Sequence, residues 1–86
     1  MSAPVDVDAL PPTQYLVMEV LAARYRLGEQ VWPFPQRLVT ALGALRKLGL
    51  IDVKSGVVRG TVVVNLTDLG RAAVLADDYV VPDTSL

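Results

Sequence analysis

Residues 34–71 of this 86-residue chain, FPQRLVTALGALRKLGLIDVKSGVVRGTVVVNLTDLGR, decide its fold. Apolar residues first recur at every third or fourth position, which predicts a helix over residues 36–48. Gly49 suits the left-handed conformation that ends such a helix. Residues 51–54 then alternate apolar and polar, and residues 61–66 are rich in β-branched side chains, so both predict strands. Between them SGVVRG, residues 55–60, predicts a hairpin tip with a positive-φ glycine at each end.

The helix over residues 36–48 should bury one side and expose the other. Its expected buried side consists of Leu38, Ala41, Leu42, Leu45 and Leu48. The hairpin should face the core with Ile51, Val53, Val62, Val64 and Leu66. Thr67 is then placed to cap a further helix over residues 68–76, with Asp68 in its first turn.

An earlier helix is predicted over residues 12–27, because two prolines and Thr13 mark its start and Gly28 its end. This helix is apolar almost all round. One stripe holds Leu16, Val20 and Leu27, with Val17 and Leu21 beside it, and a second stripe holds Tyr15, Met18, Ala22 and Tyr25. Two apolar stripes need cover on two sides. The second stripe is expected to pack in the chain's own core, or alternatively to form a dimer or partner surface together with Tyr79.

Residues 28–35, GEQVWPFP, cannot form a helix, because Pro33 and Pro35 remove backbone donors and restrict the residues before them. We expect a turn or an extended segment here. Trp32 and Phe34 are expected to fill the base of the next helix, which is favoured over stacking of Trp32 on a nucleobase.

The order of helix, hairpin and capped helix, with the phrasing LxxLGLI…VxLTxxGR, resembles the recognition helix and wing of MarR-type winged helix-turn-helix regulators. Residues 11–28, PPTQYLVMEVLAARYRLG, also resemble the first core helix of that family. The chain departs from the family pattern between these parts, since eight residues stand where a complete second helix is expected. Its small size and Val/Ala-rich composition look like those of phage-encoded or actinobacterial regulators.

The resemblance implies a single α+β domain: a small winged helix-turn-helix with three helices, a two-stranded β-hairpin wing and an abbreviated second helix. The expected organisation is a flexible N-terminal arm over residues 1–11, the winged-helix domain over residues 12–78 and a C-terminal tail over residues 79–86.

Charge is distributed unevenly along the chain. All eight basic residues lie between Arg24 and Arg71, a span with three acids and a balance of 8 − 3 = +5. The remaining segments carry six acids and no base, so the net charge is −1. Phosphate attraction is screened within about 10 Å at moderate salt, so local charge matters more than the total. The pattern suits either a DNA surface or a solvated polar face with acidic ends.

The resemblance implies a DNA-binding transcriptional regulator that contacts double-stranded DNA. Its major-groove residues would be Gln36, Arg37, Thr40 and Lys47, and its phosphate contacts would be Arg46, Lys54 and Arg59. A homodimer is expected by analogy, because MarR-type regulators pair to read two half-sites. The alternative is a winged-helix protein–protein interaction module without DNA binding, for example a phage-encoded effector of a host protein.

Other classes of function find no support in the sequence. The chain has no cysteine and no histidine, and it contains no phosphate-binding loop, metal-ligand spacing or catalytic set. We therefore expect no enzyme activity, no cofactor and no metal. No signal peptide is visible and no apolar run approaches the ~20 residues that span a bilayer, which favours a cytoplasmic protein without a membrane partner.

Overall fold

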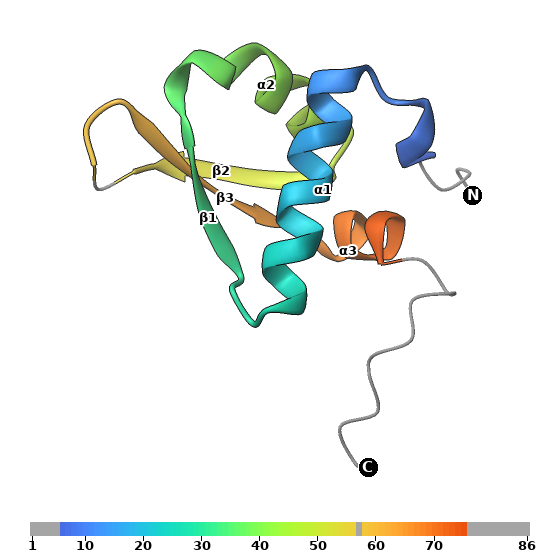
Figure 1. Ribbon diagram of the computed structural model, residues 1–86. Helices are drawn as coiled ribbons and strands as arrows, with labels where there is room; N and C mark the ends of the chain where they lie inside the picture. Colours follow the sequence, from blue (N-terminus) through green and yellow to red (C-terminus); the bar gives the residue numbers. More distant parts are fainter. Residues whose placement is uncertain (1–5, 57, 76–86) are drawn as a thin grey trace.

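The computed structural model describes residues 6–56 and 58–75. The elements follow in the order η1 (Val7–Ala9), α1 (Pro12–Arg26), β1 (Val31–Pro35), η2 (Gln36–Leu38), α2 (Val39–Lys47), β2 (Ile51–Ser55), β3 (Thr61–Leu66) and α3 (Asp68–Val74), where η denotes a single 3-10 turn. The strands form one antiparallel sheet in the order β1-β3-β2. Helices α1 and α2 pack on one face of this sheet, and the β2–β3 hairpin projects away from α1 and α3 (Figure 1).

The expectation of a sheet with only two strands is wrong, because β1 adds a third strand to the β2–β3 hairpin. It pairs along its whole length with β3, from Val31 opposite Asn65 to Pro35 opposite Thr61. The prolines that exclude a helix here hold the backbone in the extended conformation that a strand uses. They are tolerated because β1 is an edge strand, where a missing N–H donor need not break the ladder. The expected α+β class is confirmed, with a three-stranded sheet.

No complete helix stands between α1 and α2, as expected, because the strand β1 occupies most of this interval. The chain passes from Pro35 directly into the turn η2 and from there into α2. The expected helix over residues 36–48 is therefore present with a 3-10 first turn. Leu42 and Leu45 are fully buried as expected, whereas Leu48 is 42 % exposed. Leu48 lies after the last helical residue, where Gly49 (φ 78°) turns the chain into β2, so its side chain leaves the buried side.

The core is formed by apolar side chains from every layer. Its buried members are Val7, Val17, Met18, Leu21, Phe34, Leu42, Leu45, Leu50, Ile51, Val64 and Leu66. Within residues 6–56 and 58–75, no polar or charged side chain is buried. The strand alternation is as expected, with Val62 and Val53 partly buried beside this cluster. None of the helices in these residues is long and apolar enough to cross a membrane.

Helix α1 turns its second stripe toward the core together with Val17 and Leu21, and leaves Leu16, Val20 and Leu27 exposed. Met18 and Ala22 are buried, and Tyr15 and Tyr25 pack half-buried against the same cluster. The second stripe therefore packs in the chain's own core, and Met18 and Ala22 are not available as a dimer or partner surface. Tyr79, the fifth residue of that expected surface, lies outside the described residues.

The expected N-terminal arm contributes to the fold from Asp6 onward. The Asp6 carboxylate accepts a hydrogen bond from the Asp8 backbone N–H (3.0 Å) and so caps η1. Val7 belongs to the core and Leu10 packs against it. Residues 6–10 are thus a packed extension of α1 within the residues expected to form a flexible arm.

Candidate nucleic-acid interface

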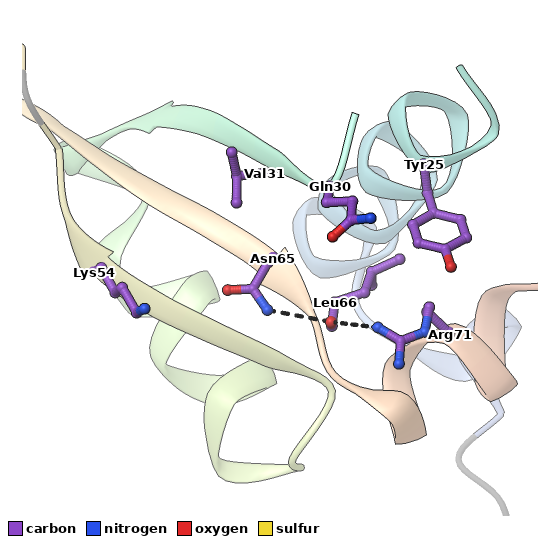
Figure 2. A pocket seen from close by; sticks show the side chains of 7 residues that line it. All are labelled: Tyr25, Gln30, Val31, Lys54, Asn65, Leu66 and Arg71. Atoms are coloured by element: carbon purple, nitrogen blue, oxygen red, sulfur yellow. Dashed lines mark hydrogen bonds between the residues drawn. The ribbon is translucent and has the colours of Figure 1, made fainter. Parts of the chain in front are cut away.

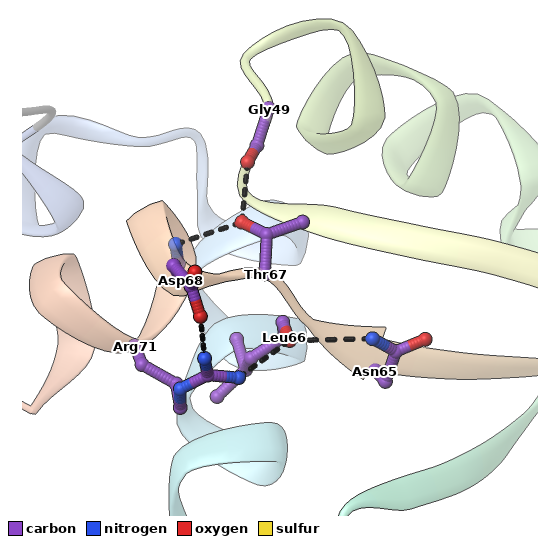
Figure 3. A network of polar contacts seen from close by, with 7 residues as sticks. Gly49, Asn65, Leu66, Thr67, Asp68 and Arg71 are labelled. Atoms are coloured by element: carbon purple, nitrogen blue, oxygen red, sulfur yellow. Dashed lines mark hydrogen bonds and ion pairs between the residues drawn. The ribbon is translucent and has the colours of Figure 1, made fainter.

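The hairpin is fixed to the helices by contacts at its base, between the Gly49 turn and the start of α3 (Figure 3). The Thr67 hydroxyl donates to the Gly49 carbonyl and accepts a hydrogen bond from the Gly70 backbone N–H (3.0 Å). The Thr67 backbone N–H donates to the Leu50 carbonyl (3.0 Å). The expected N-cap role of Thr67 is confirmed, and the same side chain also joins α3 to the end of α2.

Gly70 and Arg71 also take part in this contact between the hairpin base and the start of α3. A Cβ atom at Gly70 would lie 2.0 Å from the Leu50 carbonyl oxygen, so only glycine fits there. The Arg71 guanidinium donates to the Leu66 carbonyl (3.2 Å) and pairs with the Asp68 carboxylate. The two phrases of the sequence that carry the family resemblance, LGLI and LTDLGR, are therefore in direct contact. This contact sets how the hairpin leaves the body of the molecule.

A second contact joins the hairpin tip to the start of α2. The Gln36 backbone N–H donates to the Gly60 carbonyl (2.8 Å), which brings Arg59 beside the N-terminal end of the η2–α2 helix. Gly60 adopts a positive φ of 81°, as expected for one end of the tip, but Gly56 does not. At Gly56 the constraint is space instead, since a Cβ atom would lie 2.3 Å from Thr61 Oγ1.

The outward side of η2 and α2 is polar and basic. We call it the α2 surface and define it as Gln36, Arg37, Thr40, Gly43, Arg46 and Lys47, all of which are exposed. Nothing lies within 4 Å of a Cβ atom built at Gly43, so the middle of this surface is open. Residues 30–51 contain no aspartate or glutamate, so no acid from η2 or α2 offsets the three cations.

The structure brings most of the sequence-predicted DNA residues to this side of the molecule. Arg37 and Thr40 line one shallow groove, of about 310 Å³, which runs between the start of α1 and the start of α2. Its other lining residues are Pro11, Thr13, Gln14, Leu38 and Ala41. Gln36 bonds to Gly60, the residue after Arg59, and Arg46 and Lys47 lie at the last turn of α2.

Lys54 lies apart from the α2 surface. It stands opposite Val63 in the sheet and projects from the face that the helices do not cover, because the neighbouring Val53 faces the core. There it lines a cleft of about 260 Å³ (Figure 2). The other residues of this cleft are Tyr25, Gln30, Val31, Asn65, Leu66 and Arg71. No local pattern in the sequence indicates this cleft, because its lining residues come from five separate segments.

Inside the cleft, Arg71 and Asn65 both bond to one backbone carbonyl. The Arg71 guanidinium bonds to the Leu66 carbonyl and lies 5.7 Å from the centre of the Tyr25 ring. The Asn65 side-chain amide donates to the same Leu66 carbonyl (3.2 Å). These contacts satisfy Arg71 within the fold, so its role here is to hold the β3–α3 junction.

Trp32 has the structural role favoured from the sequence. It faces the core side of β1, is half-buried, and packs against the hydrophobic cluster. The Arg24 guanidinium covers it at 3.6 Å from the ring centre, and Arg24 also bonds to Glu29 (3.1 Å). A ring held between the core and a cation in this way has no free face for a nucleobase.

Within the described part of the chain, no group of three or more Asp, Glu, His or Cys residues is placed to hold a metal ion. Comparisons of the chain with protein-family models, with curated proteins and with solved structures find no match.

Proposed function

We propose that this protein binds double-stranded DNA through the α2 surface and acts as a transcriptional regulator. The observation that carries the proposal is an exposed, acid-free helix side with three cations, tied at its N-terminal end to a hairpin that adds Arg59. A helix of this kind fits the width of the major groove. The hairpin fixed beside this helix would contact the adjacent DNA backbone, as a wing does.

The residues divide into two roles on chemical grounds. Gln36 and Arg37 offer the amide and guanidinium groups that pair with adenine and guanine edges. Thr40 and Gly43 are small and permit close approach of the helix backbone. The remaining cations, Arg46, Lys47 and Arg59, suit phosphate oxygens, which carry most of the affinity but little sequence information.

The test is fluorescence anisotropy with a mixed-sequence duplex over a salt series. If Arg46, Lys47 and Arg59 each contact a phosphate, the logarithm of the association constant should fall with the logarithm of salt concentration with a slope of about −3. Arg37→Ala and Lys47→Ala should each weaken binding by ~1–3 kcal/mol, and Lys47→Ala should reduce the slope by about 1.

Lys54→Ala is the matched control for these variants. It also removes one exposed cation, but from the uncovered face of the sheet. It should therefore weaken binding less than Lys47→Ala does. Equal effects of Lys47→Ala and Lys54→Ala would show general charge attraction without a defined surface, and no binding at low salt would refute the proposal.

A protein-interaction module is the second candidate, and one observation favours it. Helix α1 exposes Leu16 and Val20 along one side, and its C-cap residue Leu27 continues this row. A row of exposed apolar residues at helical spacing is typical of contact surfaces between proteins. On this alternative the chain binds a protein through α1 and the duplex titration gives no binding.

A further inference from the structure

Helix α1 presents an uncovered apolar stripe to solvent. Leu16 and Leu27 are 61 % and 71 % exposed, Val20 is 38 % exposed, and Ala23 is exposed between them. The stripe lies on the side of α1 opposite Met18, so the core makes no use of it. Its spacing of four, three and four residues is that of the apolar seam between two coiled helices.

This stripe is complementary to itself. The spacing 16, 20, 23, 27 reads the same in both directions, so a two-fold axis midway between Leu21 and Ala22 superimposes the stripe on its antiparallel copy. In that arrangement Leu16 lies opposite the partner's Leu27, and Val20 lies opposite the partner's Ala23. Each layer then combines side chains of compatible size. A parallel pair would instead place Ala23 against Ala23 and leave a gap.

The charges beside the stripe agree with the antiparallel arrangement. Glu19 and Arg26 are seven residues apart, so they lie on the same edge of the stripe, and both are exposed. The two-fold axis brings Glu19 to within about 3 Å, measured along the helix, of the partner's Arg26. The same ion pair forms a second time by symmetry, as in any isologous interface.

We propose that two copies of this chain associate through antiparallel packing of α1 along Leu16, Val20, Ala23 and Leu27. This seam replaces the expected dimer surface, whose residues Met18 and Ala22 are in the core. A 15-residue helix is about 22 Å long, and four layers bury less area than a standard stable interface. The dimer therefore forms reversibly, as a weak association that grows with protein concentration. It does not depend on whether DNA is bound.

Sedimentation velocity of the full chain over a range of concentrations tests the association. The wild type should shift from monomer to dimer as concentration rises, and Val20→Glu should remain monomeric. Val58→Glu is the control, because Val58 is also an exposed valine (68 % exposed) but lies at the hairpin tip, away from the stripe, and it should dimerise like the wild type. Circular dichroism confirms that each variant is folded. A wild type that stays monomeric at millimolar concentration would overturn the proposal and leave α1 to another partner.

Charge exchange tests the arrangement. Glu19→Arg and Arg26→Glu should each weaken the dimer about tenfold by placing like charges together, and the double variant should restore it. Failure of the double variant to recover would exclude the proposed register.

Cross-linking distinguishes antiparallel from parallel pairing. The natural chain has no cysteine, so introduced thiols are the only ones present. The double variant Leu16→Cys/Leu27→Cys should form a covalent dimer in oxidised glutathione. Leu16→Cys alone should not, because the two copies of residue 16 are about 16 Å apart along an antiparallel seam. Efficient cross-linking by Leu16→Cys alone would establish parallel helices and refute the antiparallel seam.

Discussion

Two residues at the start of α3 show how a short sequence phrase encodes a tertiary contact. Thr67 satisfies both the Gly70 N–H and the Gly49 carbonyl, and Gly70 leaves room for the Leu50 carbonyl oxygen. The cap could be predicted from the sequence, because threonine before a helix has a local role. The need for glycine at position 70 could not, since the oxygen that requires it belongs to a residue 20 positions earlier.

Gly70→Ala should therefore destabilise the domain strongly. The new methyl group would lie 2.0 Å from a backbone oxygen that cannot move without shifting the start of β2, so the free energy of unfolding should fall by about 2–3 kcal/mol. Urea denaturation measures the change. Gly43→Ala is the control, because its Cβ atom meets open space in a helix interior, and it should raise stability by up to ~1 kcal/mol. A neutral Gly70→Ala variant would show that the contact with Leu50 is loose.

At the scale of elements, β1 is the main difference between expectation and structure. Pro33 and Pro35 argue against a regular strand when the sequence is read locally, and the partner strand β3 lies about 30 residues further along the chain. Pairing with a distant strand leaves no periodic signal in five residues. The α2 helix, in contrast, was predicted well because its apolar spacing is local. Lys54 shows the limit of local patterns: its alternation with Val53 predicts a side chain that faces away from the core, but only the packing of the helices on the sheet shows that this face lies apart from the α2 surface.

Unfolding experiments can establish whether β1 belongs to the cooperative domain. Trp32, the only tryptophan, lies in β1 and packs between Arg24 and the core. Its fluorescence should therefore change together with the far-ultraviolet circular dichroism of the helices, in one transition. Arg24→Ala should shift the emission of Trp32 to longer wavelength by opening one ring face to water. A fluorescence change that precedes the loss of helix signal would mean that β1 detaches separately.

At the scale of the whole molecule, opposite charges are separated along the chain. The basic residues belong to the folded body, while six acids stand before Arg24 or after Arg71. Three of those acids, Asp77, Asp78 and Asp83, follow the last described residue. A protein with this distribution attracts a polyanion locally while its net charge repels it weakly. The proposed DNA binding should therefore depend on acids that are distant in sequence from the α2 surface.

Replacing Asp77, Asp78 and Asp83 by asparagine tests this dependence. The formal net charge changes from −1 to −1 + 3 = +2 without altering the α2 surface. Duplex affinity should rise several-fold at about 50 mM salt, where the Debye length still exceeds 10 Å. The gain in affinity should disappear toward 1 M salt, where the Debye length is about 3 Å. Anisotropy titrations at both salt concentrations measure the difference. Neutralising Asp6 and Asp8 provides a comparison, since Asp6 caps the packed turn η1 and Asp8 lies within it. A triple variant whose affinity matches the wild type at low salt would show that the α2 surface acts through local charge alone.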